Sequence, residues 1–138
     1  MKPPEEEIRR LVAGWIRKAD LDFNTVVRLS AEDPFRDIVA FHAQQAVEKY
    51  LKALLTRRQI EFPKTHEIRR LLELLSPVEM ELANALGDAK WLEPFGVEIR
   101  YPSDRPETLP GDQERALQLA QIARDAVMAV LGPYLSGG

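Results

Sequence analysis

The segment from Phe41 to Leu55 constrains the fold most, because it predicts a helix with apolar side chains on both of its sides. Its sequence, FHAQQAVEKYLKALL, is rich in helix-favouring residues and contains no glycine or proline. One apolar stripe recurs at three- and four-residue steps and consists of Val39, Ala43, Ala46, Val47, Tyr50 and Leu54. The opposite side mixes large apolar and polar residues: Phe41, Leu51, Leu55, Gln44 and Glu48. A lone amphipathic helix would leave that side to solvent, so the pattern indicates cover on both sides.

Start and stop signals predict long helices before and after this segment. Prolines and glutamates at positions 3–7 suit a helix start, and the helix that they open should end before Asp33-Pro34. The next helix, which includes the segment above, should run from about residue 35 to residue 58. The last helix should extend from about Asp112 to Leu131, where Gly132-Pro133 would end it.

Shorter elements are expected between the second and the last long helix. Thr65 can cap a helix whose core face consists of Ile68, Leu71, Leu72 and Leu75. The sequence from Ser76 to Glu79 has the capping-box pattern with proline at the first helical position, and Gly87 would end the helix that it starts. Residues 87–111 contain four prolines and should be mostly irregular, with VEIRY at 97–101 as a weak strand candidate.

These elements predict an all-α fold, an antiparallel bundle of four to five helices with a long proline-rich loop before the last helix. The chain of 138 residues suits a single domain over residues 1–138, with its core between about residues 8 and 131. A loop as long as 87–111 tends to be functional or mobile, and this one carries Trp91, Phe95, Arg100 and Tyr101.

Composition excludes several classes of protein. The chain contains no cysteine, which excludes disulfides and cysteine-based metal or nucleophile chemistry. No apolar run approaches the roughly 20 residues of a membrane span, and MKPPEEEIRR lacks the apolar region of a signal peptide. We therefore expect a cytoplasmic protein without a membrane partner. The net charge of −3 means that nucleic acid would need a local basic patch.

Several motifs resemble the HEPN domain of prokaryotic proteins. They are Trp15, the KADLDF run at 18–23, FHAQQAVEKYLKALL, a histidine in KTHEIRRLLELL, and Arg100-Tyr101-Pro102 before the last helix. The resemblance covers about residues 8 to 131 and implies a bundle of four or five helices that is commonly a homodimer. It also implies a link to nucleotides or RNA, often beside a separately encoded minimal nucleotidyltransferase.

A dimeric bundle would explain the mixed helix side. Phe41, Leu51 and Leu55 would then be buried at a helix pair, with a structural polar cluster beside them consisting of Asp22, Gln44, Gln45 and Glu48. Because an unpaired buried carboxylate costs several kcal/mol, we expect Glu48 to pair with Lys52 one turn later, and Asp22 to meet Lys49 or Lys52. The alternatives are that these polar residues only set the helix register or that they belong to a binding cleft.

The sharper motif of HEPN ribonucleases is not found where the resemblance places it. That motif is an arginine followed, after four to six residues, by a histidine near the start of the last helix. Here the segment RYPSDRPETLPGD has Arg100 and Arg105 but no histidine. A formal match from Arg36 to His42 lies at the start of a continuous helix, where the two side chains point about 120° apart. No catalytic residue is therefore assigned, and enzymatic activity is left open with binding favoured.

The predicted ligand site comes from the resemblance and consists of Lys49, Lys52, His66, Arg100 and Tyr101. Cations and a helix N-terminus at His66 would attract phosphate, and a tyrosine can stack on a base. The alternatives are that His66 packs between helices and that Arg100 pairs with Glu48 to pin the loop onto the bundle. No metal site or cofactor motif is found.

The sequence thus favours a HEPN-type protein that binds a nucleotide or RNA, or that acts as the partner of a nucleotidyltransferase, in a toxin–antitoxin-like or defence context. One alternative is an RNA-cleaving toxin with an altered active site that uses Arg100, Tyr101 and His66. The other is a helical interaction module without a ligand.

Overall fold

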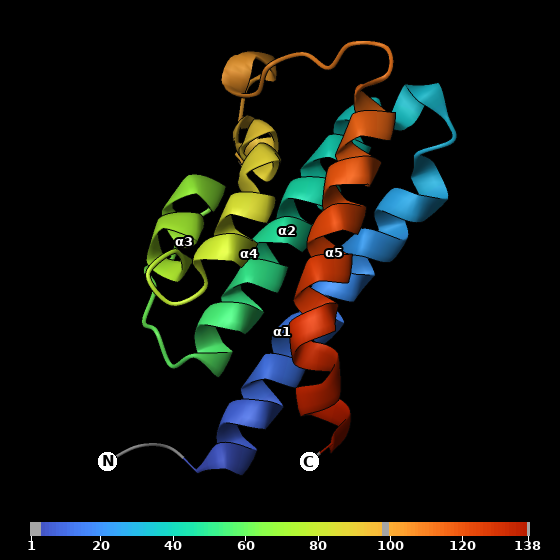
Figure 1. Ribbon diagram of the computed structural model, residues 1–138. Coiled ribbons are helices and arrows are strands. Elements are labelled where there is room, and N and C mark those ends of the chain that lie inside the picture. Colours follow the sequence, from blue (N-terminus) through green and yellow to red (C-terminus); the bar gives the residue numbers. More distant parts are fainter. Residues whose placement is uncertain (1–3, 98–99, 138) are drawn as a thin grey trace.

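The computed structural model describes residues 4–97 and 100–137, and every regular element within these ranges is helical. The α-helices are α1 (Glu5–Leu29), α2 (Arg36–Arg57), α3 (Ile68–Leu75), α4 (Met80–Ala85) and α5 (Asp112–Gly137). Three 3-10 helices join them: η1 (Asp33–Phe35), η2 (Gly87–Gly96) and η3 (Pro102–Asp104). The predicted all-α bundle is confirmed. In Figure 1, α1 runs antiparallel to both α2 and α5.

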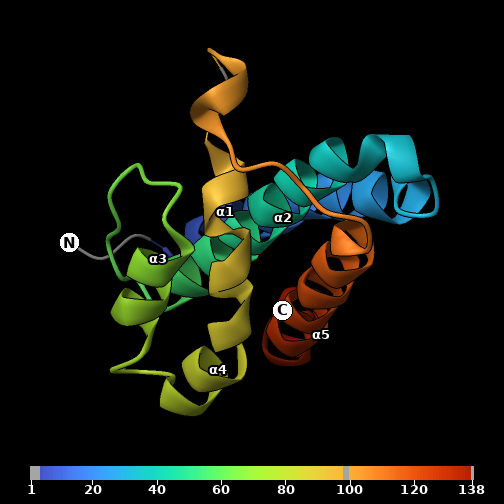
Figure 2. The same cartoon turned by 90° about the horizontal axis from the view of Figure 1, so that it is seen from above.

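Helix α2 lies at the centre of the bundle. It packs against α1, α5, η2 and α3, and Figures 1 and 2 show it between α5 on one side and the shorter helices on the other. Leu51, Leu55 and Gln44 are fully buried, and Glu48 is nearly so. One protomer therefore covers both sides of α2, and the mixed pattern of this helix needs no second chain to explain it.

A partly buried hydrogen-bond network joins the three long helices. The Tyr50 hydroxyl on α2 donates to Asp20 Oδ1 on α1, and Arg124 Nε on α5 donates to the same oxygen at 3.3 Å. Tyr50 is fully buried. Burial, together with the hydrogen bond to Asp20, raises the pKa of Tyr50, so its hydroxyl remains a proton donor.

Helix α3 begins later than predicted, and Thr65 is not its cap. The Thr65 hydroxyl accepts a hydrogen bond from the Glu67 amide, but the residue at the N-cap position is Glu67, whose side chain makes no capping hydrogen bond. The carbonyl of His66 accepts from Gln44 Nε2 at 2.8 Å. This contact with α2 holds the backbone around His66 extended, and the helix starts only after it.

The predicted capping box from Ser76 to Glu79 does not form. Ser76 is instead the C-cap of α3, with its amide donating to the carbonyl of Leu72, and the short helix α4 starts at Met80. Gly87 does lie just past the end of α4, as predicted, because Leu86 is the C-cap of that helix. The residues that follow, which were expected to be mostly irregular, form η2 up to Gly96. Its buried residues Ala89, Leu92 and Phe95 recur every three residues, which matches the three residues per turn of a 3-10 helix.

Helix α5 continues through Gly132-Pro133 to Gly137, contrary to the prediction that it ends there. Contacts with its last turn account for the extension. Arg9 Nε donates to the carbonyl of Tyr134, and the guanidinium groups of Arg9 and Arg57 lie 4.9 and 4.1 Å from the centre of the Tyr134 ring. The weak strand candidate at 97–101 falls partly on residues 98–99, outside the described residues; Arg100 and Tyr101 form bends.

No helix in the described part of the chain is long and apolar enough to cross a membrane.

We expect Tyr50→Phe to lower the free energy of unfolding by about 1–2 kcal/mol, because it removes a hydrogen bond to a charged group from the centre of the bundle. Urea unfolding followed by circular dichroism measures the change. Tyr101→Phe is the matched control, since Tyr101 is 68% exposed, and it should change stability by less than about 0.5 kcal/mol. Equal losses in both variants would contradict the structural role of Tyr50.

Candidate functional site

Two clusters of a carboxylate, a histidine and a lysine lie along α2. The first, which we call the Asp22 site, joins α1 to α2. Asp22 Oδ1 lies 2.9 Å from His42 Nδ1, and Asp22 Oδ2 accepts from Lys49 Nζ. His42 and Lys49 share one face of α2 because seven residues make about two helical turns. The side chains of His42 and Lys49 are 29% and 22% exposed, so both reach the surface.

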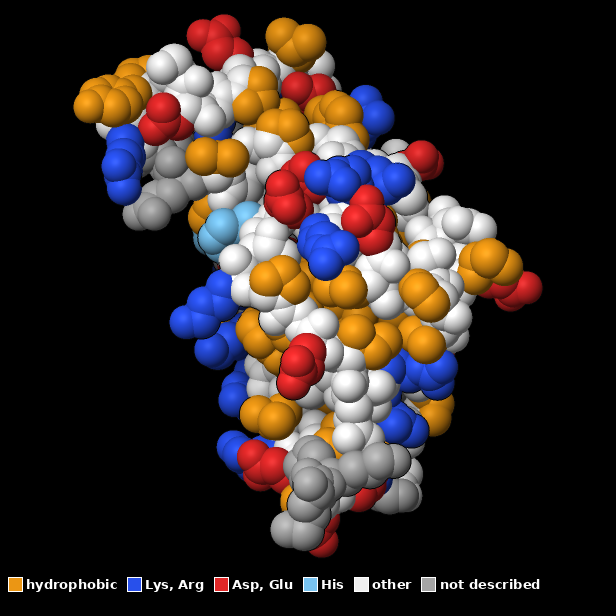
Figure 3. All heavy atoms as spheres, turned by 90° about the vertical axis from the view of Figure 1, so that its left-hand side faces the viewer, with side chains coloured by type: hydrophobic (Ala, Val, Ile, Leu, Met, Phe, Trp, Pro, Cys, Tyr) orange, Lys and Arg blue, Asp and Glu red, His pale blue; other side chains and the backbone are white. Residues whose placement is uncertain are grey.

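The second cluster, which we call the Glu48 site, joins α2 to the segment before α3. Glu48 Oε1 lies 2.8 Å from His66 Nδ1, and Glu48 Oε2 accepts from Lys52 Nζ at 2.9 Å. The Glu48 side chain is almost completely buried, whereas the His66 side chain is 66% exposed. A buried carboxylate therefore holds a histidine at the surface. Figure 3 shows histidine side-chain atoms on the face that it views, together with lysine and arginine atoms.

Gln44 organises the interior side of the Glu48 site. Its Nε2 donates to the carbonyl of His66 at 2.8 Å and to Glu48 Oε1 at 3.4 Å, and its Oε1 accepts from Gln45 Nε2 at 2.7 Å. Gly96 at the end of η2 packs directly on Gln44. A Cβ atom at position 96 would lie 2.2 Å from Gln44 Cδ, so only glycine fits there without displacing Gln44.

Two aromatic rings cover Lys52. Its Nζ lies 5.5 Å from the centre of the Trp15 ring and 5.8 Å from that of Phe62, and the two rings pack edge to face at 6.1 Å. The Lys52 side chain is only 9% exposed. Lys52 therefore neutralises Glu48 inside the protein, and His66 is the member of this site that is open to solvent.

The loop before α5 approaches the start of α2 through Arg105. The Arg105 guanidinium lies 4.4 Å from the centre of the Phe41 ring, its Nε donates to the carbonyl of Val97, and the Phe41 ring packs against His42. Arg105 donates through Nε, and the negative charge of Asp37 lies close enough to act on its guanidinium. Arg105 thus stands beside the Asp22 site.

Arg100 and Tyr101 precede η3 and are exposed. The Asp104 carboxylate accepts hydrogen bonds from both of their backbone amides, at 2.7 and 2.9 Å, and these bonds lower the pKa of Asp104. Neither side chain contacts the Asp22 or the Glu48 site within the described residues. Glu48 is held by Lys52 and His66, so the alternative in which Arg100 pairs with Glu48 is not found.

The helix N-terminus expected to attract phosphate beside His66 is not available there. Helix α3 begins at Ile68, two residues after His66, and its Arg69 amide donates to Glu93 Oε1 of η2 at 2.9 Å. A carboxylate of the chain itself therefore occupies the position that an anion would take.

The predicted residues thus fall into three groups. Lys52, His66, Gln44, Gln45 and Glu48 come together, Asp22 and Lys49 form a separate site with His42, and Arg100 and Tyr101 stand on the η3 turn. The predicted pairs Glu48–Lys52 and Asp22–Lys49 are both present. His42 and Arg105 were not among the predicted site residues, although the seven-residue spacing between His42 and Lys49 could have indicated a shared partner.

The chemistry of the two sites follows from the histidine hydrogen bonds. A carboxylate accepts, so Nδ1 of each histidine donates and Nε2 is the nitrogen left for a ligand. His42 of the Asp22 site and Glu48 of the Glu48 site are six residues apart on α2, so these two parts of the sites are separated by about 9 Å along the helix axis. Within the described residues, no group of three or more histidine, aspartate or glutamate side chains is arranged to hold a metal ion.

Comparison with known proteins places this geometry in a family. Neither the curated proteins nor the solved structures contain a match to the chain. The model of the HEPN domain matches residues 12–131, which is most of the chain and includes α2 and both sites. HEPN domains generally bind or cleave RNA or occur in toxin–antitoxin pairs. The chain belongs to the HEPN domain family.

Proposed function

We propose that the chain binds a nucleotide or RNA at the surface where the Asp22 site and the Glu48 site open to solvent. The observation that carries this proposal is that both histidines of the chain are fixed at Nδ1 by a carboxylate, which leaves Nε2 of each for a phosphate oxygen. Membership of the HEPN family supports the choice of ligand.

Charge balance favours a phosphate-bearing ligand. Lys49 neutralises Asp22 and Lys52 neutralises Glu48, so a ligand meets no uncompensated negative charge at either site. Arg105 beside Phe41 adds a positive charge, and each histidine adds another when it is protonated. On this basis His66, His42, Lys49 and Arg105 contact the ligand, while Lys52 positions Glu48. Arg100 and Tyr101, both exposed on the η3 turn, reach its outer part, where the Tyr101 ring stacks on a base.

The family also supports a role beside a nucleotidyltransferase, in a toxin–antitoxin-like or defence setting. In that setting the bound nucleotide or RNA is the shared substrate of the pair. The competing proposal is a helical interaction module without a ligand, in which both sites only tie α1 and the segment before α3 to α2.

Binding of a fluorescein-labelled single-stranded RNA and of a labelled adenine nucleotide, measured by anisotropy, tests this proposal. We expect His66→Ala and Arg100→Ala each to weaken binding about tenfold, or roughly 1.4 kcal/mol, because each removes an exposed contact. Arg100 is exposed, so Arg100→Ala should hardly change the melting temperature, whereas His66→Ala removes a hydrogen-bond partner of the buried Glu48 carboxylate and should lower it. Binding is therefore measured at a temperature at which circular dichroism shows each variant to be folded. Lys90→Ala is the control, since it removes an exposed cation of η2 outside both sites. Absence of binding to either probe would favour the ligand-free module.

A second candidate function is metal-independent RNA cleavage, which the two histidines held by carboxylates at Nδ1 favour. In such cleavage one histidine takes the proton of the ribose 2′-hydroxyl as that oxygen attacks phosphorus. The other histidine gives a proton to the departing 5′-oxygen, and a cyclic phosphate remains. Asp22 and Glu48 would position the imidazoles, as a carboxylate does in a catalytic triad. This site differs from the arginine–histidine motif that is missing after Arg100.

Incubation of labelled RNA with the purified protein and excess EDTA tests this candidate. We expect His42→Gln and His66→Gln each to slow cleavage by about 10²–10⁴-fold, and the wild-type rate to show a bell-shaped pH dependence. Lys90→Ala again serves as the control. Cleavage that survives both histidine substitutions would exclude the two-histidine mechanism, and an inactive wild-type protein would leave binding alone.

We also propose that the protein is a homodimer, as HEPN domains often are. Since one protomer already covers α2, the support comes from α5, where Ile122 and Val130 are exposed and a hollow of about 340 Å³ lies beside Leu117 and Ile122. Light scattering should give about twice the chain mass of 15.7 kDa. Ile122→Glu should shift the protein to the monomer, whereas Leu109→Glu in the loop should not. A wild-type monomer at micromolar concentration would end this proposal.

A further inference from the structure

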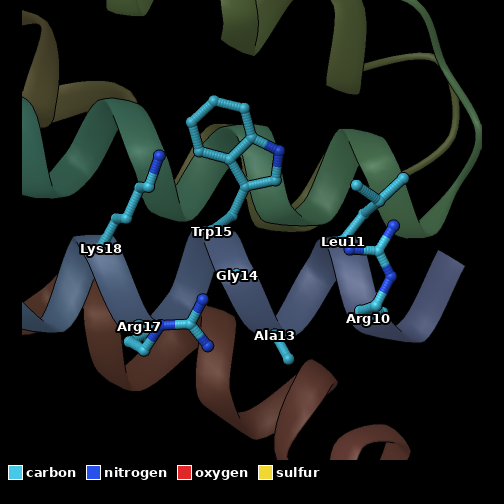
Figure 4. A pocket seen from close by; sticks show the side chains of 7 residues that line it. All are labelled: Arg10, Leu11, Ala13, Gly14, Trp15, Arg17 and Lys18. Atoms are coloured by element: carbon cyan, nitrogen blue, oxygen red, sulfur yellow. The ribbon is translucent and has the colours of Figure 1, made fainter. Parts of the chain in front are cut away.

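The outward side of α1 carries a hollow of about 390 Å³ that no other described element covers. Its lining comes from α1 alone and consists of Arg10, Leu11, Ala13, Gly14, Trp15, Arg17 and Lys18. Figure 4 shows Leu11, Trp15 and Lys18 on one side of the helix, Arg17 and Ala13 on the other, and Gly14 between them. We call this surface the outer α1 face. It lies outside the Asp22 and Glu48 sites.

No close contact within the described residues requires glycine at position 14. A Cβ atom added there would meet only the tip of Arg17, at 3.9 Å. Glycine in a helix interior costs roughly 0.5–1 kcal/mol relative to alanine. The open space above Gly14 therefore suits the close approach of a group from another molecule.

Charge is segregated across α1. Three acids, Glu5, Glu6 and Glu7, lie in its first turn, where Glu7 pairs with Arg10. Between Arg9 and Leu29 the helix has five cations and two acids. Both acids are engaged by side chains of other helices: Asp20 accepts from Tyr50 and Arg124, and Asp22 from His42 and Lys49. In contrast, no ion pair of Arg17, Lys18 or Arg28 forms in the part of the chain that the structure describes. The outer α1 face is therefore positive although the whole chain has a net charge of −3.

Apolar side chains accompany these cations. Leu11 is 44% exposed and Leu21 is 66% exposed, and the ten residues between them correspond to about 15 Å along the helix. Leu11, Gly14, Lys18 and Leu21 follow one another at steps of three and four residues, the spacing at which one helix meets another. The exposed stripe thus combines apolar anchors, a gap and positive charge.

We propose that the outer α1 face binds an acidic amphipathic helix of a partner protein. An apolar side chain of that helix enters the hollow above Gly14, its apolar stripe covers Leu11 and Leu21, and its carboxylates face Arg17 and Lys18. This proposal concerns a surface other than the two histidine sites and does not depend on them.

Charge argues against the other occupants. A second copy related by a twofold axis at Gly14 would bring Arg17 and Lys18 of both chains onto one interface, which is unfavourable. Arg10, which would face Lys18 of the other copy, is already paired with Glu7 of its own helix. RNA would use the cations but not the leucines, and the Trp15 ring, its natural stacking partner, already packs against Phe62 and Lys52.

Two synthetic helical peptides of about three heptads test the proposal, both with leucine at the seam positions. The first carries glutamate at the flanking positions and the second carries lysine there. In a Trp91→Phe background Trp15 is the only tryptophan, and its emission reports binding at the hollow. We expect the glutamate peptide to bind at micromolar concentration and the lysine peptide to bind at least tenfold more weakly. Arg17→Glu with Lys18→Glu should reverse this preference.

Gly14→Leu fills the hollow and should weaken binding of the glutamate peptide at least tenfold. It removes a helix-interior glycine and meets no neighbouring atom except Arg17, so the variant should fold, which circular dichroism checks. Gly132→Leu is the matched control, because Gly132 is a glycine of α5 that also has open space around it, and it should bind like the parent.

Four results would overturn the proposal. Two concern the peptides: no binding of the glutamate peptide up to about 100 µM, a concentration that would detect even weak association, or equal binding of both peptides. The other two would indicate another occupant: displacement of the glutamate peptide by single-stranded RNA would indicate RNA, and a change in the mass of the protein alone on Gly14→Leu would indicate a second copy.

Discussion

The buried carboxylate of Glu48 is the interaction on which the arrangement around α2 depends. A carboxylate in this position costs several kcal/mol unless it is paired and hydrogen-bonded. Glu48 receives Lys52 from its own helix, Gln44 one turn earlier and His66 from the segment before α3. Satisfying this one group fixes a lysine beneath two aromatic rings, a histidine at the surface and the path of the chain into α3. The Glu48 site is therefore a structural requirement of the fold.

The same requirement explains how η2 reaches α2. Gln44 must hold both Glu48 and the carbonyl of His66, and it is fully buried while doing so. Gly96 leaves the space that the Gln44 side chain fills. Apolar residues of η2 at three-residue spacing then complete the cover of α2. Polar contacts thus set the position of the connecting segments, and apolar burial supplies most of the stabilisation.

The sequence predicted what depends on local periodicity. The three long helices, the core face of α3 and the pairs Glu48–Lys52 and Asp22–Lys49 follow from helical spacing and from the cost of unpaired charge. The errors occur where a distant contact overrides a local signal. Gln44 keeps the chain extended at His66 and delays α3, and Arg9 and Arg57 hold the last turn of α5 beyond Pro133. His42 was overlooked although it lies two turns before Lys49 on the same face of α2 and shares its partner, Asp22.

The KADLDF run at 18–23 shows how one short segment serves both surfaces of α1. Lys18 lies on the outer α1 face, while Asp20 and Asp22 contact other helices of the bundle: Asp20 binds Tyr50 and Arg124, and Asp22 binds His42 and Lys49. Phe23 enters the core. Because these acids are neutralised by other helices of the bundle, they no longer offset the outward cations locally. A chain of net negative charge can therefore present a positive face on α1, and the internal polar network is what makes that face possible.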